Sequence, residues 1–173
     1  MTQRITTVLI AALVLVAIAA PASAGEHRLG VGVHYWKNLD SISDDLPDFQ
    51  VDDDGLTTVL SYQYVTGLVR FELDAEYFES GFEGSTDWAV APQAYVLIGR
   101  GLYGGIGVGT TYSNDFGSSF SDPYFIAKAG FDMLLLPKIH LDLNADYRFA
   151  NWDEIDDYST ETITLGATVR FTF

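Results

Sequence analysis

The chain has 173 residues and no cysteine, and 24 acidic residues against 9 Lys and Arg give a formal net charge of −15. This length suits one domain, and the lack of cysteine excludes disulfides as a source of stability. The acidity excludes nucleic acid as a partner, because nucleic-acid binding relies on Lys and Arg that neutralise phosphates. A hydrophobic content of 48% and an aromatic content of 14% argue against a disordered chain.

The first 24 residues have the pattern of a secretory signal peptide. Arg4 precedes an apolar run of 13 residues, Val8–Ala20, and Pro21–Ala24 ends in a small-x-small cleavage site. The run is too short for a helix to cross about 30 Å of hydrocarbon, and no cysteine follows it that could carry a lipid anchor. We therefore expect cleavage after Ala24, which leaves residues 25–173 as one exported domain.

Apolar and polar residues alternate along the exported part, most clearly in Val69–Phe78, Ile139–Phe149 and Thr162–Phe173. A period of two predicts strands with one apolar face. Five further segments follow the rule less strictly: Arg28–Trp36, Thr57–Val65, Trp88–Ile98, Leu102–Tyr112 and Tyr124–Leu134. Each of the eight predicted strands has about the length that a tilted strand needs to span a bilayer.

The connections between these strands alternate in length. Three are short, at Thr66–Gly67, Gly99–Gly101 and Leu135–Lys138. Four are long, at Lys37–Leu56, Glu79–Asp87, Ser113–Pro123 and Ala150–Glu161. This alternation is typical of outer-membrane barrels, whose short turns are periplasmic and whose long loops lie outside the cell.

Alternation alone leaves the direction of the apolar face open, because a soluble sandwich or a lipocalin-like barrel would also alternate. Three observations indicate that the apolar face points toward lipid. No charged residue lies on the apolar face from Leu29 to Phe173, where a Lys or Arg at the bilayer midplane would cost about 2–4 kcal/mol. Aromatic residues on that face gather at both strand ends, as interfacial girdles do. Glycines gather on the opposite face, as a narrow lumen requires.

The chain ends in Val169-Arg170-Phe171-Thr172-Phe173, which resembles the assembly signal of bacterial outer-membrane proteins. Residues 25–173 resemble the small eight-stranded outer-membrane β-barrel family, which includes the OmpA membrane domain and OmpX. The resemblance implies an all-β, eight-stranded antiparallel up-and-down transmembrane β-barrel in a Gram-negative outer membrane. It also implies contact with outer-membrane lipid and lipopolysaccharide, and recognition by the barrel-assembly machinery during biogenesis. We expect a monomer.

Pro92 conflicts with a regular strand over Trp88–Ile98, because proline has no N–H for the ladder and a closed barrel has no free edge. We expect a β-bulge at Pro92, or a strand that starts later than Trp88.

The charged residues divide between the loops and the predicted lumen. The four long connections hold 17 of the 24 acidic residues, and Lys37 is their one Lys or Arg. We expect loosely bound divalent cations there. The strands place five basic and six acidic residues on the inward face: Arg28, Arg70, Lys128, Arg148 and Arg170, with Glu72, Asp74, Glu76, Asp132, Asp142 and Asp146.

Because buried charges need partners, the near balance of these residues predicts a packed, largely plugged lumen. Glu72, Asp74 and Asp142 should pair with Arg70, Arg170 or Lys128 across neighbouring strands, and Asp142 with Arg170 is the favoured pair. The alternative is a gated pore of low conductance in which an Arg switches between carboxylates.

His34 is the best candidate for catalysis. It lies at the outer end of the first predicted strand, where we expect Asp146 and Arg148 nearby, and Ser41 or Ser43 follows in the adjoining loop. Such a set could support acyl transfer by a lipid A-modifying enzyme. The spacing matches no deacylase or palmitoyltransferase motif, and the alternative is that His34 belongs to the lumen network.

Three other features receive structural interpretations. His140, expected among Asp142 and Arg170, is taken as structural. The acidic run Asp52–Gly55 lacks the ligand spacing of an EF-hand. The glycine run Gly104–Gly109 lies within a predicted strand rather than before a helix, which excludes a phosphate-binding loop.

The sequence therefore predicts a non-enzymatic outer-membrane barrel with acidic external loops that contributes to envelope integrity or surface interaction. The alternatives are the low-conductance pore and the enzyme that uses His34. No catalytic, cofactor-binding or metal-binding residue is assigned.

Overall fold

The computed structural model describes residues 25–38, 54–79, 88–113, 119–149 and 162–173. Ten strands lie within these ranges: β1 (Glu26–Asn38), β2 (Asp54–Thr66), β3 (Val69–Phe78), β4 (Ala89–Gly99), β5 (Leu102–Gly109), β6 (Tyr112–Ser113), β7 (Ser119–Phe120), β8 (Tyr124–Leu136), β9 (Ile139–Phe149) and β10 (Thr162–Thr172). None of the described residues forms a helix that is long and apolar enough to cross a membrane.

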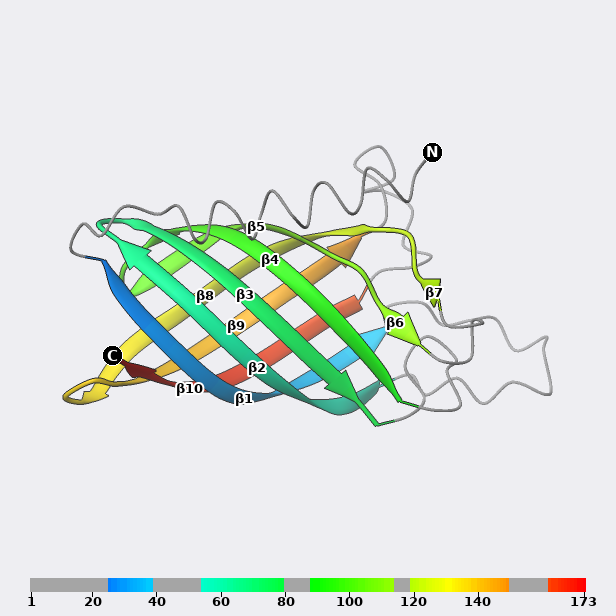
Figure 1. Cartoon of the computed structure of the whole chain (residues 1–173), viewed down its shortest axis with the longest axis horizontal. Coiled ribbons are helices and arrows are strands. Elements are labelled where there is room, and N and C mark those ends of the chain that lie inside the picture. The colour runs from blue at the N-terminus through cyan, green and yellow to red at the C-terminus, as the bar shows by residue number, and fades with distance from the viewer. Residues whose placement is uncertain (1–24, 39–53, 80–87, 114–118, 150–161) are drawn as a thin grey trace.

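Eight of these strands close into a barrel in which sequence neighbours pair antiparallel (Figure 1). β1 pairs with β2 on one side and with β10 on the other, where Leu29 lies opposite Phe171. β3 pairs with β4, and β5 pairs with β8, so the ring has no free edge. The prediction of an eight-stranded antiparallel up-and-down β-barrel is confirmed.

Tight turns join the strands at one end of the barrel. Gly67 has a φ of 62° between β2 and β3, and Lys138 has a φ of 70° between β8 and β9. Two-residue hairpin turns use positive φ because their twist then matches that of the flanking strands. The β8–β9 register shifts between Leu134 and Leu136, and β8 continues past its predicted end at Leu134.

Pro92 lies within β4, and the expected bulge is absent, although β4 starts one residue later than the predicted Trp88. β4 begins at Ala89, and its register with β3 runs unbroken through the pair Ala75 and Pro92. The irregularity lies on the other side, where Thr110 N donates to Pro92 O at 3.2 Å. Pro92 has no N–H to return to Thr110, and the strand assignment there breaks between β5 and β6.

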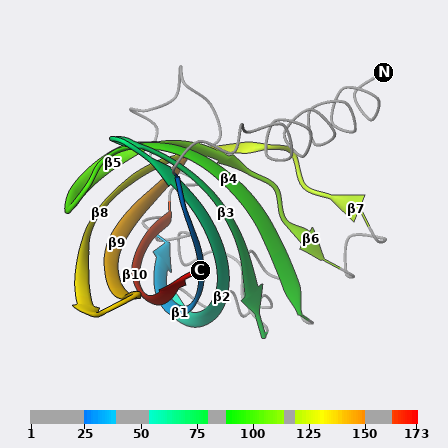
Figure 2. The same cartoon turned by 60° about the vertical axis from the view of Figure 1, so that its left-hand side comes forward.

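β6 and β7 form a small hairpin beyond the barrel wall (Figure 2), where the sequence analysis placed the end of a strand, Tyr112, and the start of a long loop. Tyr112 of β6 lies opposite Phe120 of β7 and also opposite Val90 of β4. The rings of Trp88, Tyr112 and Phe120 follow one another, with centroids 6.0 Å and 5.3 Å apart. The hairpin therefore extends the β4 ladder past the break at Pro92.

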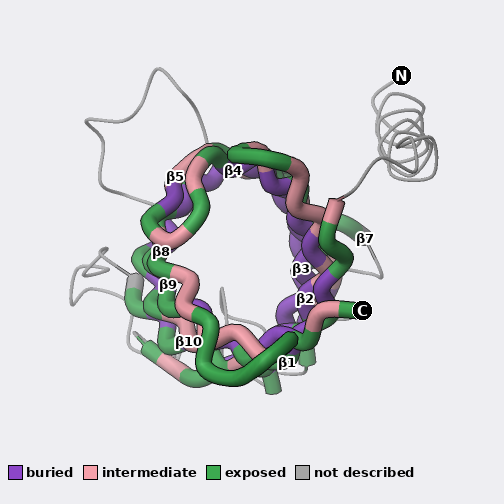
Figure 3. Tube along the Cα trace, turned by 90° about the vertical axis from the view of Figure 1, so that its left-hand side faces the viewer, coloured by how far each residue is buried: buried purple, intermediate pink, exposed green. Residues whose placement is uncertain are grey.

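The barrel is apolar outside and polar inside, and Figure 3 shows the ring of strands along its axis. Among the described residues, 21 polar or charged residues are buried against 10 hydrophobic ones. On β1, Leu29, Val31 and Val33 are 50%, 62% and 56% exposed, whereas Arg28 and His34 are 6% and 1% exposed. Soluble monomers rarely expose so continuous an apolar surface, but lipid hydrocarbon accommodates it.

Candidate functional site

The interior side chains come from every second residue of each strand. On β3, Glu72, Asp74 and Glu76 are buried, while Phe71, Leu73 and Tyr77 between and beside them are exposed. Successive side chains of a strand point to opposite faces, so a strand that alternates acidic and apolar residues delivers a row of carboxylates to the lumen. Interior carboxylates, from β3 and from other strands, meet basic side chains at three levels of the barrel.

The middle level is the central cluster, which consists of Glu72, Asp74, Lys128, Asp142 and Arg170. Lys128 Nζ donates to Glu72 Oε1 at 2.8 Å and to Asp74 Oδ2 at 3.0 Å. Arg170 lies 3.1 Å from Glu72 and 2.8 Å from Asp142. The favoured pair of Asp142 with Arg170 is therefore present. The ion pairs of Glu72 instead join β3 to β8 and β10, which are not its neighbours in the sheet, so they cross the interior.

Neutral groups complete the shell of the central cluster. Tyr103 Oη donates to Asp142 Oδ1 at 2.8 Å, and Asn144 Nδ2 donates to the same oxygen at 3.1 Å. Gln63 Nε2 donates to Glu72 Oε2 at 2.6 Å. Burial of an ion pair is tolerated where further hydrogen bonds satisfy its remaining atoms, and these donors serve that purpose. The sequence analysis assigned none of these three residues a role.

Glycines on neighbouring strands make room for tyrosine rings inside the barrel. A Cβ on Gly107 would overlap the ring of Tyr95, and a Cβ on Gly130 would overlap the ring of Tyr103. The Tyr95 ring centroid lies 4.3 Å from Lys128 Nζ, within cation–π range. The predicted clustering of glycine on the inward face thus has a specific cause, which is the space that these rings occupy.

The long-loop cluster consists of His34, Glu76, Gln93 and Arg148. Glu76 hydrogen-bonds with His34 Nδ1 and accepts from Arg148 Nη2, and Gln93 Nε2 donates to it at 2.8 Å. His34 was expected beside Asp146 and Arg148, and the structure links it to Arg148 through Glu76. Ser41 and Ser43 lie outside the described residues.

An apolar group adjoins the long-loop cluster at that end of the barrel. Trp36, Phe78, Ala89 and Ala91 are buried together, and the Trp36 and Phe78 rings meet edge to face with centroids 6.5 Å apart. The sequence analysis missed this group, because it searched the inward face for charge. The alternation along the strands could have revealed this group, because Trp36 is two residues from His34 and Phe78 is two residues from Glu76, which places each on the inward face.

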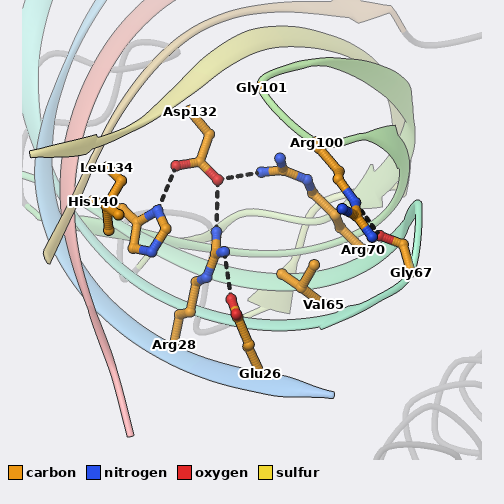
Figure 4. A pocket seen from close by; sticks show the side chains of 10 residues that line it. All are labelled: Glu26, Arg28, Val65, Gly67, Arg70, Arg100, Gly101, Asp132, Leu134 and His140. Carbon is orange, nitrogen blue, oxygen red and sulfur yellow. Dashed lines mark hydrogen bonds and ion pairs between the residues drawn. The ribbon is translucent and has the colours of Figure 1, made fainter. Parts of the chain in front are cut away.

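The short-turn cluster is centred on Asp132, and Figure 4 shows Arg28, Arg70 and His140 converging on it. Asp132 Oδ2 accepts from Arg28 Nη1 at 2.6 Å and from Arg70 Nη1 at 2.8 Å. Asp132 Oδ1 lies 2.9 Å from His140 Nδ1. Arg28 Nη2 also donates to Glu26 at 2.7 Å.

The partners at this level differ in part from those expected. Arg70 was one of three basic residues expected to pair with the carboxylates of the central cluster, but it contacts Asp132 instead. His140 lies opposite Arg170 in the β9–β10 ladder, as expected, and its Nδ1 also contacts Asp132. The strands of a barrel are tilted and staggered, so residues from distant strands share a level that chain position alone does not give. A cavity of about 350 Å³ opens here, lined by Glu26, Arg28, Val65, Gly67, Arg70, Arg100, Gly101, Asp132, Leu134 and His140.

One wall of the interior carries polar atoms that lack a partner among the described residues. They include His34 Nε2 on β1, Asn144 Oδ1 on β9, and the hydroxyls of Thr164 and Thr168 on β10. Buried polar atoms in proteins are commonly satisfied by ordered water. Ordered water could therefore satisfy these atoms beside the ion pairs that Asp142 and Arg170 make on the same wall.

The remaining sequence motifs add no site. The glycine run Gly104–Gly109 lies in β5, within the barrel wall. Asp52 and Asp53 lie outside the described residues, and within the described ranges no three His, Cys, Asp or Glu residues are grouped to hold a metal ion.

A closed barrel with an apolar outer surface and ion pairs across its interior defines the class of outer-membrane β-barrel proteins. Residues 8–171 match the family described as outer membrane protein beta-barrel domain. The chain belongs to this family, and its place is the outer membrane. No curated protein sequence matches the chain.

Several solved structures resemble this one. The neisserial surface protein A, NspA, is 16% identical with a TM-score of 0.56, and the match covers 86% of this chain and 97% of NspA. The N-terminal barrel of OprF from Pseudomonas aeruginosa is 12% identical with a TM-score of 0.49, covering 86% of this chain and 99% of that barrel. Ail from Yersinia pestis is 18% identical with a TM-score of 0.43, covering 86% and 97%. The likeness to NspA supports the fold alone.

Proposed function

We propose that this protein is a non-enzymatic barrel whose lumen is plugged by ion pairs and whose acidic loops face the outside of the cell. Its role would be envelope integrity or surface interaction. The observation that carries the proposal is the pair of contacts made by Glu72, which receives Lys128 at 2.8 Å and Arg170 at 3.1 Å from across the interior. All three side chains are almost fully buried.

A lumen closed in this way opposes conduction. An ion that passes the central cluster must break contacts between buried charges, and a buried charge that loses its partner costs about 3–5 kcal/mol. The apolar group of Trp36 and Phe78 adds a second barrier toward the long-loop end. Such a barrel would act through its surface, where 17 of the 24 acidic residues lie in the long connections.

The proposal includes a direction in the membrane and a route of assembly. The short turns would face the periplasm, and the long loops would face outward among lipopolysaccharide phosphates and loosely bound divalent cations. The barrel-assembly machinery would recognise the terminal strand, in which Phe173 N donates to His27 O at 3.0 Å and continues the β1–β10 seam.

Planar-bilayer recording of the refolded protein in concentrated KCl tests the plugged lumen. We expect no sustained channels for the wild type and discrete openings for Glu72→Ala, because that substitution removes the shared partner of Lys128 and Arg170. The matched control is Asp122→Ala, which removes an exposed carboxylate and should leave the bilayer conductance at the wild-type level. Steady wild-type channels at low voltage would contradict the proposal.

The low-conductance pore is the second candidate, and the unpartnered polar atoms of β1, β9 and β10 favour it. A file of water along that wall would let small ions or protons pass beside the ion pairs. Under this alternative the wild type conducts, and Thr168→Val lowers the conductance while Glu72→Ala has little effect.

A lipid-modifying activity through His34 receives less support. The His34 side chain is 1% exposed and its Nδ1 is engaged by Glu76. An acyl-transfer base needs access to its nucleophile and substrate, and His34 faces the interior rather than the lipid.

A further inference from the structure

The cavity at the short-turn mouth differs from the rest of the interior in its balance of charge. Three arginines, Arg28, Arg70 and Arg100, line it together with His140, against the two carboxylates Glu26 and Asp132. The formal charge of this lining is positive, in a chain whose net charge is −15. Its volume of about 350 Å³ falls within the range of small-ligand pockets, roughly 300–1,000 Å³.

Backbone carbonyls of two turns orient two of the arginines. Arg70 Nε donates to Gly99 O at 2.8 Å, and Arg100 Nε donates to Gly67 O at 3.2 Å. These bonds use the Nε positions, and Asp132 holds one further nitrogen, Arg70 Nη1, at 2.8 Å. Among the described residues, Arg70 Nη2 and both terminal nitrogens of Arg100 have no hydrogen-bond partner, and Arg28 Nε is buried without one.

The two carboxylates of the cavity are held unequally. Asp132 is nearly buried and accepts from Arg28, Arg70 and His140 together, so it is part of the wall. The Glu26 side chain is 56% exposed and contacts only Arg28 within the described residues. Glu26 therefore occupies a position on Arg28 that an anion from solution could take.

We propose that this cavity binds a phosphate-type oxyanion, which displaces Glu26 from Arg28 and accepts from the free nitrogens of Arg70 and Arg100. The planar fork of Arg matches the oxygens of phosphate in two-point contacts. A cation is disfavoured by the three guanidinium groups, and an apolar ligand would leave their donors unsatisfied. The phosphate could be free or carried by a lipid headgroup, because the chemistry of recognition is the same.

Calorimetric titration of the refolded protein in maltoside micelles with inorganic phosphate tests the proposal, with chloride at equal ionic strength as the blank. A second titration uses micelles that contain phosphatidylglycerol. Saturable one-to-one binding of inorganic phosphate assigns the site to soluble anions, and saturation by the lipid alone assigns it to a headgroup. Absence of saturable binding in both titrations would overturn the proposal.

Variants separate this site from a general effect of charge. Arg100→Gln should weaken binding roughly tenfold, the size expected for one lost charge-assisted contact, and Arg100→Lys should recover only part of it. Lys138→Gln removes the same charge from the third short turn, outside the cavity lining, and should change little. Equal weakening in Arg100→Gln and Lys138→Gln would show that only net charge matters, and the site would be refuted.

A gain in affinity gives an independent test that misfolding cannot imitate. Glu26→Gln removes the proposed competitor on Arg28 and should tighten phosphate binding several-fold. Asp54→Asn removes an exposed acidic group at the long-loop end of β2 and should not. If Glu26→Gln leaves the affinity unchanged, the ligand does not occupy the position of Glu26 and the proposed mode of binding is wrong.

Discussion

Asp142 shows how a single buried carboxylate is satisfied in this interior. It lies 2.8 Å from Arg170, and its Oδ1 accepts from Tyr103 at 2.8 Å and from Asn144 at 3.1 Å. Arg170 keeps a second carboxylate, Glu72, at 3.1 Å. The loss of Asp142 would therefore leave Arg170 partly compensated, and two neutral donors without an acceptor.

Asp142→Ala should destabilise the refolded barrel by about 3 kcal/mol, the lower end of the range for breaking a buried pair, because Glu72 still contacts Arg170. Urea unfolding followed by fluorescence gives the free energy of unfolding. The double variant Asp142→Ala with Arg170→Ala should recover part of the loss, since the uncompensated charge is gone. The control is Asp122→Ala, which removes an exposed carboxylate and should leave the free energy of unfolding unchanged. A single variant as stable as the wild type would mean that water already screens this pair.

The sequence could predict some of these contacts and not others. Asp142 and Arg170 lie on adjacent strands, and adjacency follows from chain order in an up-and-down barrel. Lys128 with Glu72, and Arg70 with Asp132, join strands that are not adjacent. Such pairs depend on strand stagger and on the reach of long side chains, and neither quantity can be read from alternation.

At the scale of the strand, β5 is distinguished by glycines on both of its faces. Gly107 points inward, where a Cβ would overlap the Tyr95 ring and approach Ala94 O at 2.8 Å. Gly104 is open, since the nearest atom to its Cβ would be Lys128 O at 3.5 Å. The two glycines are three residues apart on one strand, so they separate the effect of packing from that of strand propensity.

Gly107→Ala should therefore lower the free energy of unfolding by about 1–3 kcal/mol, because a methyl group there forces Tyr95 away from Lys128. Gly104→Ala should be neutral or slightly stabilising, since alanine restricts the unfolded chain more than glycine does. Urea midpoints of both variants in the same micelles measure the difference. Equal midpoints would show that the interior is loose enough to absorb the methyl group.

The eight barrel strands were predictable because each is long and carries one apolar face that lipid accepts. The β6–β7 hairpin was missed because two-residue strands have too few positions to display a period. Pro92 was recognised as a conflict, but its consequence was assigned to the wrong strand. Proline lacks a donor toward one neighbour only, so β4 keeps its register with β3 and the break falls in the strand on the other side.

At the scale of the whole molecule, the direction of insertion can be tested from outside the cell. Protease added to intact cells should cut in the long connections, near residues 44–54 or 153–157; all of these residues except Asp54 lie outside the described residues. The short turns at Gly99–Gly101 and Leu135–Lys138 should be cut only after the outer membrane is permeabilised. Fragments mapped by mass spectrometry distinguish the two patterns, and cleavage of intact cells at the short turns alone would reverse the orientation.

The seam between β1 and β10 also determines how the barrel responds to force. Arg28 lies opposite Thr172 at the short-turn end, and the pairing continues without a break to Asn38 and Thr162. A pull applied between the first and last described residues would load this ladder from one end, one hydrogen-bonded pair after another, as a zipper opens. The strands would not be sheared along their length, where many pairs share the load. The barrel should therefore be mechanically weak when it is pulled by its two ends, and one opened seam would expose the edges of β1 and β10 together.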